Sequence, residues 1–372
     1  MYKFFSFLAI VLLLVGCVPK SKTKEDHTKH NRFAKGFLID YEKEVLEITS
    51  PWQGANIHLS YTKKNTSNIR KEGVMSIALP KQMKRIVSFS TTHIGFLREL
   101  GILDHLVGIS GANYVNDPAL LERIKNGDLQ DVGYDNTLNE ELILSLKPDV
   151  ILAYGVGSEV MDLYERFQKF HIPVVVIGEY NELHPLGKLE WIKVFGFLFD
   201  KQDLADAIFN KKEIAYTKLV EQVKSSNLKK PSVLTGFPYK DAWWLAGGRT
   251  LLAQLIRDAG ANYLWDDKKV NKAFVVSFEE VYLKSNKADF WIDCGVMSSK
   301  KQIVESDPRF QKFRPFKENH IYNNNLRMSP DGGNDYWESG VVNPELVLKD
   351  MIAIFHPELL PEHLFYFYQK IN

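Results

Sequence analysis

The sequence contains little cysteine and no excess charge of either sign. Only two cysteines occur in 372 residues, so the chain cannot build a framework of internal disulfides. The 47 basic and 46 acidic side chains give a formal net charge of +1. This balance argues against a nucleic-acid partner, because such a partner calls for a basic stripe. The hydrophobic and charged fractions are those of an ordinary globular protein.

The residue patterns of several enzyme classes are also missing. The ten histidines are not grouped at zinc-ligand spacing, and the sequence shows no set of two histidines and one carboxylate. No Gly-x-Ser-x-Gly elbow occurs, and Gly247-Gly248 lacks the Lys-Ser/Thr of a phosphate-binding loop. We therefore expect no resident metal, no cofactor and no enzymatic activity.

The apolar run at the N-terminus is too short to span a bilayer stably. Lys3 precedes residues 4–15, which only Ser6 interrupts, and small residues lead to Cys17. This pattern predicts a signal peptide over residues 1–16. Cys17 resembles the acylated first residue of bacterial lipoproteins, so residues 17–34 are expected to be a lipid-anchored flexible tether in the periplasm or another extracytoplasmic compartment. The alternative is a plain secreted protein in which Cys17 is incidental.

The remaining chain of about 355 residues exceeds the size at which one core usually keeps growing, so two domains are expected. One pattern occurs twice. Each copy has an acidic helix start, a short amphipathic helix, an Asp turn, a buried strand and a glycine six residues after the Asp. A repeat of this kind predicts two similar α/β lobes. The copies start at Glu140-Glu141 and Glu279-Glu280, and their turns are at Asp149 and Asp289.

Four segments follow from the hydrophobic patterns. Alternating residues over 35–80 predict two or three antiparallel strands. Short apolar strands with helices between them predict lobes with mostly parallel sheets over residues 81–183 and 231–372. Residues 184–230 have no proline between Pro185 and Pro231, and their apolar residues recur at helical spacing. They predict a linking helix of about 60 Å, which Gly196 and Asp200 can kink or split.

Several segments carry a family resemblance by their order and spacing. They include Lys84-Arg85-Ile86-Val87-Ser88, Lys147-Pro148-Asp149-Val150-Ile151, and Leu255-Ile256-Arg257-Asp258-Ala259-Gly260-Ala261-Asn262. Over residues 84–356 the chain resembles the substrate-binding lipoproteins of ABC importers for iron-siderophores, haem and cobalamin, periplasmic binding proteins whose lobes are joined by one long helix. The early strands and residues 355–367 look like the Bacteroides-type branch.

The resemblance implies a monomer that delivers an iron complex or a corrinoid to an ABC permease with its ATPase. In the family, one glutamate on each lobe docks into arginines of the permease. The matching positions are Glu141 and Glu279, with Glu140 and Glu280 one residue away. An acidic residue at a helix start is also favoured by the helix dipole alone.

The ligand cleft is expected between the lobes, at the carboxyl ends of the parallel strands. Aromatic faces suit macrocycles and aromatic chelates, and arginine suits anionic ferric complexes. Trp243 and Trp244 are neighbours on one strand, so one of them is expected in the core. His93 is either an axial metal ligand or a simple hydrogen-bonding residue. A surface chelate reductase or chelatase on the same scaffold is the alternative function. The predicted ligand-binding residues are His93, Tyr114, Tyr154, Tyr239, Trp243, Trp244, Arg249, Arg327 and Trp337.

Overall fold

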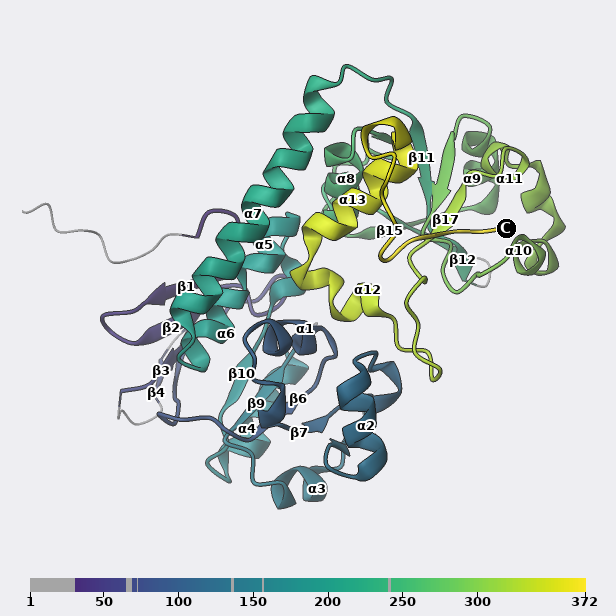
Figure 1. The fold of residues 1–372 in the computed structure, drawn as a ribbon. Coiled ribbons are helices and arrows are strands. Elements are labelled where there is room, and N and C mark those ends of the chain that lie inside the picture. The colour runs from purple at the N-terminus through teal and green to yellow at the C-terminus, as the bar shows by residue number, and fades with distance from the viewer. Residues whose placement is uncertain (1–30, 65–68, 72, 135–136, 156, 240–241) are drawn as a thin grey trace, which may run out of the picture.

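The computed structural model describes residues 31–64, 69–71, 73–134, 137–155, 157–239 and 242–372. The predicted signal peptide and Cys17 lie outside these residues. Two α/β lobes lie next to each other, and the long helix α7 (Gln202–Ser225) runs from the first toward the second (Figure 1). The predicted fold class, two α/β lobes with mostly parallel sheets joined by a long helix, is confirmed.

The first lobe is built on a sheet of five parallel strands in the order β10-β9-β6-β7-β8. Every residue of β6, β9 and β10 is buried, as expected for a parallel sheet covered on both faces. The elements of this lobe are β6 (Ile86–Ser88), α1 (Thr92–Glu99), β7 (Leu106–Ile109), α2 (Pro118–Asn126), β8 (Gln130–Asp131), α3 (Glu140–Ser145), β9 (Val150–Ala153), α4 (Glu159–Gln168) and β10 (Val174–Val176).

The second lobe repeats this plan with the strand order β14-β11-β16-β17-β18, in which only β18 is antiparallel. A small antiparallel sheet, β12-β13-β15, lies beside it. The strands are β11 (Ser232–Thr235), β12 (Pro238–Tyr239), β13 (Ala242–Ala246), β14 (Asn262–Tyr263), β15 (Ala273–Val276), β16 (Phe290–Ile292), β17 (Ile321–Asn323) and β18 (Gln369–Lys370). The helices are α8 (Leu251–Asp258), α9 (Phe278–Ser285), α10 (Lys300–Ser306), α11 (Arg314–Lys317), α12 (Asp335–Glu338) and α13 (Pro344–Phe355).

The aspartate of the repeated pattern performs the same structural task in both lobes. Asp149 Oδ2 accepts the backbone N–H groups of Lys84 and Arg85, at 2.7 and 2.9 Å, just before β6. Asp289 Oδ2 accepts the N–H of Ser232, the first residue of β11, at 2.7 Å. Each aspartate therefore ties the start of one central strand to the start of its neighbour, which explains why the pattern occurs once in each lobe.

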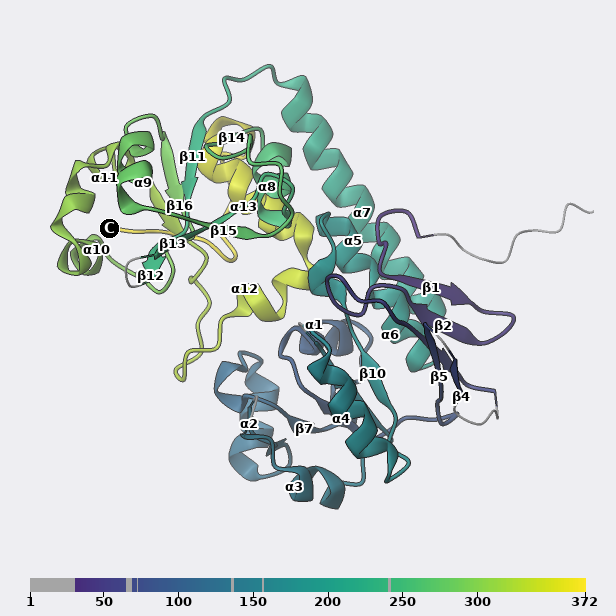
Figure 2. The ribbon, with the colours of Figure 1, turned by 180° about the vertical axis from the view of Figure 1, so that it is seen from behind.

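The N-terminal segment forms five strands rather than the predicted two or three. They are β1 (Phe37–Asp40), β2 (Val45–Ile48), β3 (His58–Thr62), β4 (Ile69–Lys71) and β5 (Val74–Ala78), in the order β1-β2-β3-β5-β4. The pair β3 and β5 is parallel and the other pairs are antiparallel. Tyr61 Oη accepts the N–H of Val176 in β10 at 3.0 Å, so this sheet is attached to the edge strand of the first lobe (Figure 2).

The segment predicted as one linking helix is divided into three helices. α5 (Pro185–Glu190) and α6 (Ile192–Leu198) precede α7. Asp200 has φ 55°, a left-handed conformation that cannot continue a right-handed helix. Gly196 allows α6 to pack closely on α7, because a Cβ there would lie 2.7 Å from Ala205 Cβ. The linking helix itself therefore has 24 residues and a length of about 36 Å.

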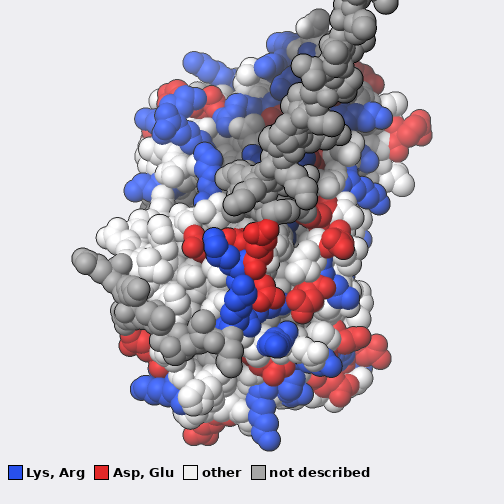
Figure 3. All heavy atoms as spheres, turned by 90° about the vertical axis from the view of Figure 1, so that its left-hand side faces the viewer, with Lys and Arg blue, Asp and Glu red and all other residues white. Residues whose placement is uncertain are grey.

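Basic and acidic side chains are interspersed on the face of the molecule that carries the N-terminal sheet and α6 (Figure 3). This mixture agrees with the near-zero net charge of the sequence. Within the described part of the chain, no helix combines the length and the apolar character needed to cross a membrane.

Candidate functional site

A cavity lies where the two lobes meet, with a volume of about 240 Å³. This volume is just below the lower end of the range of small-molecule sites. The first lobe contributes residues from the carboxyl ends of β6, β7, β8 and β9, and the second contributes the loop that leads into α12. The cavity therefore lies at the carboxyl ends of the parallel strands, as predicted from the sequence. Its lining consists of Phe89, Ser90, Thr91, Ser110, Tyr114, Tyr134, Tyr154, Gly332, Asn334 and Trp337.

Three residues predicted from the sequence line this cavity: Tyr114, Tyr154 and Trp337. Tyr134 was not among the predicted ligand-binding residues, although it follows β8 by three residues and the same strand-end rule selects it. Its ring lies 5.6 Å from that of Tyr114, measured between centroids. Gly111, with φ 72°, allows this pair to form, because a Cβ there would approach both rings to 3.0 Å.

The structure contradicts the prediction that His93 contacts ligand. His93 lies in the first turn of α1 and is fully buried. Its Nδ1 is 2.8 Å from Ser88 Oγ, and its Nε2 has no partner among the described residues. Burial lowers the pKa of the ring to about 3. Because α1 begins at Thr92, His93 lies inside the helix and its imidazole is buried in the core, where it makes a simple hydrogen bond.

The buried His93 should make the protein sensitive to mild acid. Its pKa is about 3 in the folded state against 6.5 for the free side chain, so only the unfolded chain takes up the proton as pH falls below 6.5. Stability is therefore lost between pH 6.5 and 3, by about 2 kcal/mol at pH 5. Urea unfolding at pH 7.5 and at pH 5.0 measures this effect. Between these two pH values the free energy of unfolding should fall less for His93→Leu than for the wild type. The exposed His58→Gln serves as control, and an equal loss in His93→Leu would contradict the assignment.

Trp243 is also a core residue and not a cleft residue. Its side chain is 1% exposed, and its Nε1 donates to the carbonyl of Thr235 at 3.2 Å. Its ring lies 6.0 Å from that of Trp291 and 6.2 Å from that of Phe313, within an aromatic cluster of the second lobe. Trp244, on the opposite face of β13, is 55% exposed. The prediction that one of the two tryptophans belongs to the core is confirmed, and that residue is Trp243.

The other second-lobe residues predicted to bind ligand do not line the cavity. Tyr239 and Trp244 are exposed on the small antiparallel sheet, and Arg249 is exposed in the turn before α8. Arg327 uses its Nε to donate to Asp335 Oδ2 at 2.6 Å, and its guanidinium lies 4.5 Å from the centroid of the Tyr366 ring. Arg327 therefore holds α12 within its own lobe. The sequence could not reveal this role, because Tyr366 is 39 positions away (366 − 327).

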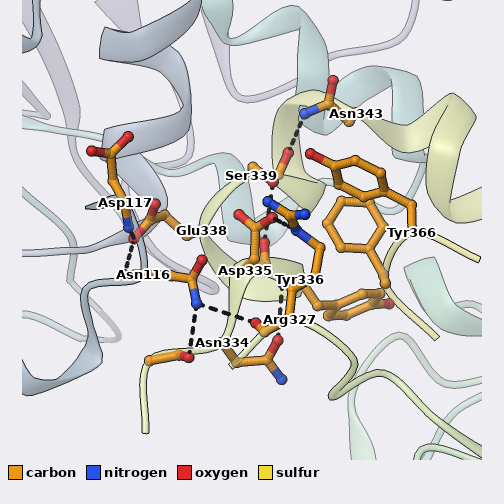
Figure 4. A network of polar contacts seen from close by, with 12 residues as sticks. Asn116, Asp117, Arg327, Asn334, Asp335, Tyr336, Glu338, Ser339, Asn343 and Tyr366 are labelled. Atoms are coloured by element: carbon orange, nitrogen blue, oxygen red, sulfur yellow. Dashed lines mark hydrogen bonds and ion pairs between the residues drawn. The ribbon is translucent and has the colours of Figure 1, made fainter. Parts of the chain in front are cut away.

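A buried carboxylate joins α12 to the first lobe (Figure 4). The Glu338 side chain has 0% exposure, and its Oε1 accepts from Arg98 Nη2 of α1 at 2.5 Å. Its Oε2 accepts the backbone N–H of Asn116 at 2.6 Å, and Arg98 Nε donates to Asp117 Oδ2 at 2.8 Å. Because Asn334 and Trp337 lie on the same short segment, this network fixes the second-lobe wall of the cavity.

The two predicted docking glutamates occupy equivalent positions in their helices. The N-cap side chains of Asn139 and Ser277 accept the N–H of Leu142 and Glu280 respectively. Glu141 and Glu279 are each the second residue after the cap, and both are exposed.

The neighbouring glutamates are engaged within the chain. Glu140 forms an ion pair with Arg166, and Glu280 Oε1 accepts from Trp265 Nε1 at 2.9 Å. This geometry favours Glu141 and Glu279 as the outward-facing pair. Their surroundings differ, because Glu279 shares a surface hollow with Arg309, whereas no ion pair of Glu141 occurs among the described residues.

The described residues show no arrangement that could bind a metal ion. No group of three or more His, Cys, Asp or Glu residues there could hold a metal ion. Cys294 is fully buried two residues after β16, and burial raises the pKa of its thiol well above the usual value. It is therefore a small buried hydrophobic residue and not a reactive thiol.

Comparison with known proteins agrees with this geometry. A family model described as periplasmic binding protein matches residues 86–324. An uncharacterized lipoprotein of Methanocaldococcus jannaschii is 22% identical over 376 aligned positions, covering 94% of this chain and 87% of the relative.

Solved structures share the fold. A possible iron-binding, periplasmic solute-binding protein of Staphylococcus epidermidis has a TM-score of 0.58 and 22% identity, covering 74% of this chain and all of that one. A protein of the ABC-type Fe3+-hydroxamate transport system of Saccharomonospora viridis has a TM-score of 0.56 and 18% identity. This match covers 78% of this chain and 99% of that one. The family consists of solute-binding proteins and not enzymes, so the alternative of a reductase or chelatase finds no support. Because the family model spans more than half of the sequence, the chain belongs to the periplasmic binding protein family.

Proposed function

We propose that this protein is the extracytoplasmic solute-binding lipoprotein of an ABC importer and that it captures a metal chelate between its lobes. The observation that carries the proposal is the ring-lined cavity at the lobe junction. Phe89, Tyr114, Tyr134 and Tyr154 come from one lobe and Trp337 from the other. Aromatic faces of this kind suit a macrocycle or an aromatic chelate, and the hydroxyl and amide groups between them can fix its orientation.

The charge of the cavity narrows the class of cargo. No Lys, Arg, Asp or Glu belongs to its described lining. A charged group buried there would lose hydration without gaining a counter-charge. Three hydroxamates balance one ferric ion, whereas three catecholates leave three negative charges. The cargo should therefore have an uncharged metal-bearing part, as in a ferric trihydroxamate, the haem macrocycle or cobalamin.

Two further features belong to the proposal. Glu141 and Glu279 would meet cationic groups of the permease, one from each lobe, and Cys17 would carry the lipid that keeps the protein at a bacterial membrane. The names of the structural neighbours, one possibly iron-binding and one of an Fe3+-hydroxamate transport system, support an iron complex as the cargo.

The test is a fluorescence titration of the soluble Cys17→Ser variant, which lacks the anchor and should need no detergent. A neutral ferric trihydroxamate, haem and cobalamin should be compared with a trianionic ferric tris-catecholate. At least one uncharged-core cargo should quench tryptophan emission and bind more tightly than the tris-catecholate. Trp337→Ala should weaken that binding by about tenfold or more.

Trp244→Ala is the matched control, because Trp244 is similarly exposed but lies outside the cavity. Tightest binding of the tris-catecholate would contradict the assignment of an uncharged cargo. Recovery of a reduced or demetallated product would contradict a binding role altogether.

A further inference from the structure

An open groove lies where the N-terminal sheet, the first lobe and the second lobe come together. Its volume is about 370 Å³. The first lobe contributes residues 180–181 from a 3-10 turn that begins three residues after β10. The N-terminal segment contributes Lys35 and most of the turn 50–54 between β2 and β3, and the second lobe contributes residues 271–272. The walls of the groove therefore come from three parts of the chain that are far apart in sequence.

The groove adjoins the interlobe cavity at the carboxyl edge of the first-lobe sheet. Tyr180 lines the groove and donates its hydroxyl to the carbonyl of Gly155, the residue after Tyr154 of the cavity lining. The cavity itself, at about 240 Å³, is smaller than a usual small-molecule site. A bulky chelate held there extends beyond it, and the groove offers the adjoining space.

The groove carries positive charge, in contrast to the interlobe cavity. Lys35 and Lys272 are exposed, and neither ammonium has an ion-pair partner in the described part of the chain. Glu182, the one carboxylate of the described lining, is 6% exposed. Its Oε1 accepts the N–H of Gly36 at 2.9 Å and that of Trp191 Nε1 at 3.0 Å, and both its oxygens accept from the backbone N–H of Lys35. Because these donors satisfy Glu182, the two lysines are available to an anion from outside the chain.

Apolar side chains border the groove as well. Trp52 is half-buried, and Tyr180 and Leu183 are 36% and 44% exposed. Gln53 Nε2 donates to Asn271 Oδ1 at 3.4 Å. This contact joins the N-terminal wall of the groove to the second-lobe wall. The groove therefore combines hydrocarbon surface with basic groups on two sides, a combination that suits a short carbon chain with an anionic end.

We propose that the groove binds a carboxylate arm of the cargo while the uncharged metal-bearing part occupies the interlobe cavity. Lys35 and Lys272 would attract the carboxylate from two walls, and the hydrocarbon of the arm would pack against Trp52 and Tyr180. This inference rests on the proposed function and adds to it the charge of the cargo's periphery. The family model begins at residue 86 and does not include the N-terminal wall of the groove.

Two pairs of chelates test the proposal, because the members of each pair differ chiefly in a carboxylate arm. They are the succinyl and acetyl derivatives of ferrioxamine B, and haem and its dimethyl ester. In fluorescence titration of the Cys17→Ser protein at low ionic strength, the carboxylate member of at least one pair should bind about fivefold more tightly, the size expected for exposed ion pairs. The preference should shrink in about 0.5 M NaCl, because salt screens exposed charges.

Replacing Lys35 and Lys272 together by glutamine should bring the two affinities of that pair within about twofold of each other. The matched control replaces Lys81 and Lys268 by glutamine. Both are exposed, one in the segment after β5 and one in the loop that carries Lys272, and neither lines the groove. The control should keep the wild-type preference.

The proposal is overturned if the wild type binds a pair without preferring the carboxylate member in either pair. It is also overturned if the Lys35 and Lys272 double variant keeps the preference, or if the control double variant loses it to the same extent. Failure of all four chelates to bind would overturn the proposed capture of a metal chelate and this inference with it, so the two failures are distinguishable.

Discussion

Cargo uptake should fall to less than about a tenth of the wild-type rate when Glu141 and Glu279 are both replaced by arginine, while cargo affinity stays unchanged. In the proposed complex, each replacement would turn an attraction toward a permease arginine into a repulsion, and like charges placed together at an interface cost several kcal/mol. Neither glutamate belongs to the described lining of the interlobe cavity. The measurement pairs the dissociation constant of the free protein with uptake, or ATPase stimulation, by the permease in proteoliposomes.

The matched control is Glu122→Arg, which reverses an exposed charge on α2 of the first lobe without touching the repeated helix start. It should leave uptake near the wild-type level. Glu141→Arg alone is the cleaner single variant, because Glu279 interacts with Arg309 of its own chain. Normal uptake by the double variant would show that the glutamates do not contact the permease. Their role would then be limited to a favourable interaction with the dipoles of their own helices.

Replacing Glu338 by glutamine should lower the free energy of unfolding by about 3 kcal/mol and also weaken cargo binding. Removing one partner of a buried ion pair leaves the other charge uncompensated. Here the neutral side chain would weaken the contacts with Arg98 and with the N–H of Asn116. Binding should suffer as well, because α12 carries Trp337 into the cavity. Urea unfolding and fluorescence titration measure the two effects.

Glu140→Gln provides the comparison for Glu338→Gln. It breaks an ion pair of the same chemistry with Arg166, but those side chains are 40% and 47% exposed. A surface pair of this kind contributes less than about 1 kcal/mol. If both variants lose similar stability, the Glu338 network does not hold the lobes together. If Glu338→Gln is destabilised but binds cargo normally, α12 is not held in place by this carboxylate.

Much of the fold could be predicted because the deciding signals are local. Apolar runs predicted β9 and β11, and the acidic pairs Glu140-Glu141 and Glu279-Glu280 marked the starts of α3 and α9. The split of the linking segment was predicted only in part. Asp200, named from the sequence as a possible break, has the left-handed backbone that separates α6 from α7, whereas the break between α5 and α6 at Trp191 interrupts a continuous helical pattern.

The candidate site was predictable only in outline. The rule that ligands bind at the carboxyl ends of parallel strands selected Tyr114 and Tyr154, and it would also have selected Tyr134. It selected His93 as well, which the structure places in the core. Residue type and strand position can identify the edge of the sheet, but they do not show which way each side chain turns.

The sequence by itself determined the class of the fold, the duplication of the lobe and the edge at which the cavity lies, because each depends on residues within one strand or helix. Only the tertiary structure decided which charges are available to a ligand or a partner. Glu338 meets Arg98 across 240 positions of sequence, and Arg327 lies against the ring of Tyr366. Lys35 and Lys272 line one groove although 237 positions separate them (272 − 35). Burial and pairing are properties of side chains brought together by folding, and periodicity along the chain carries no information about them.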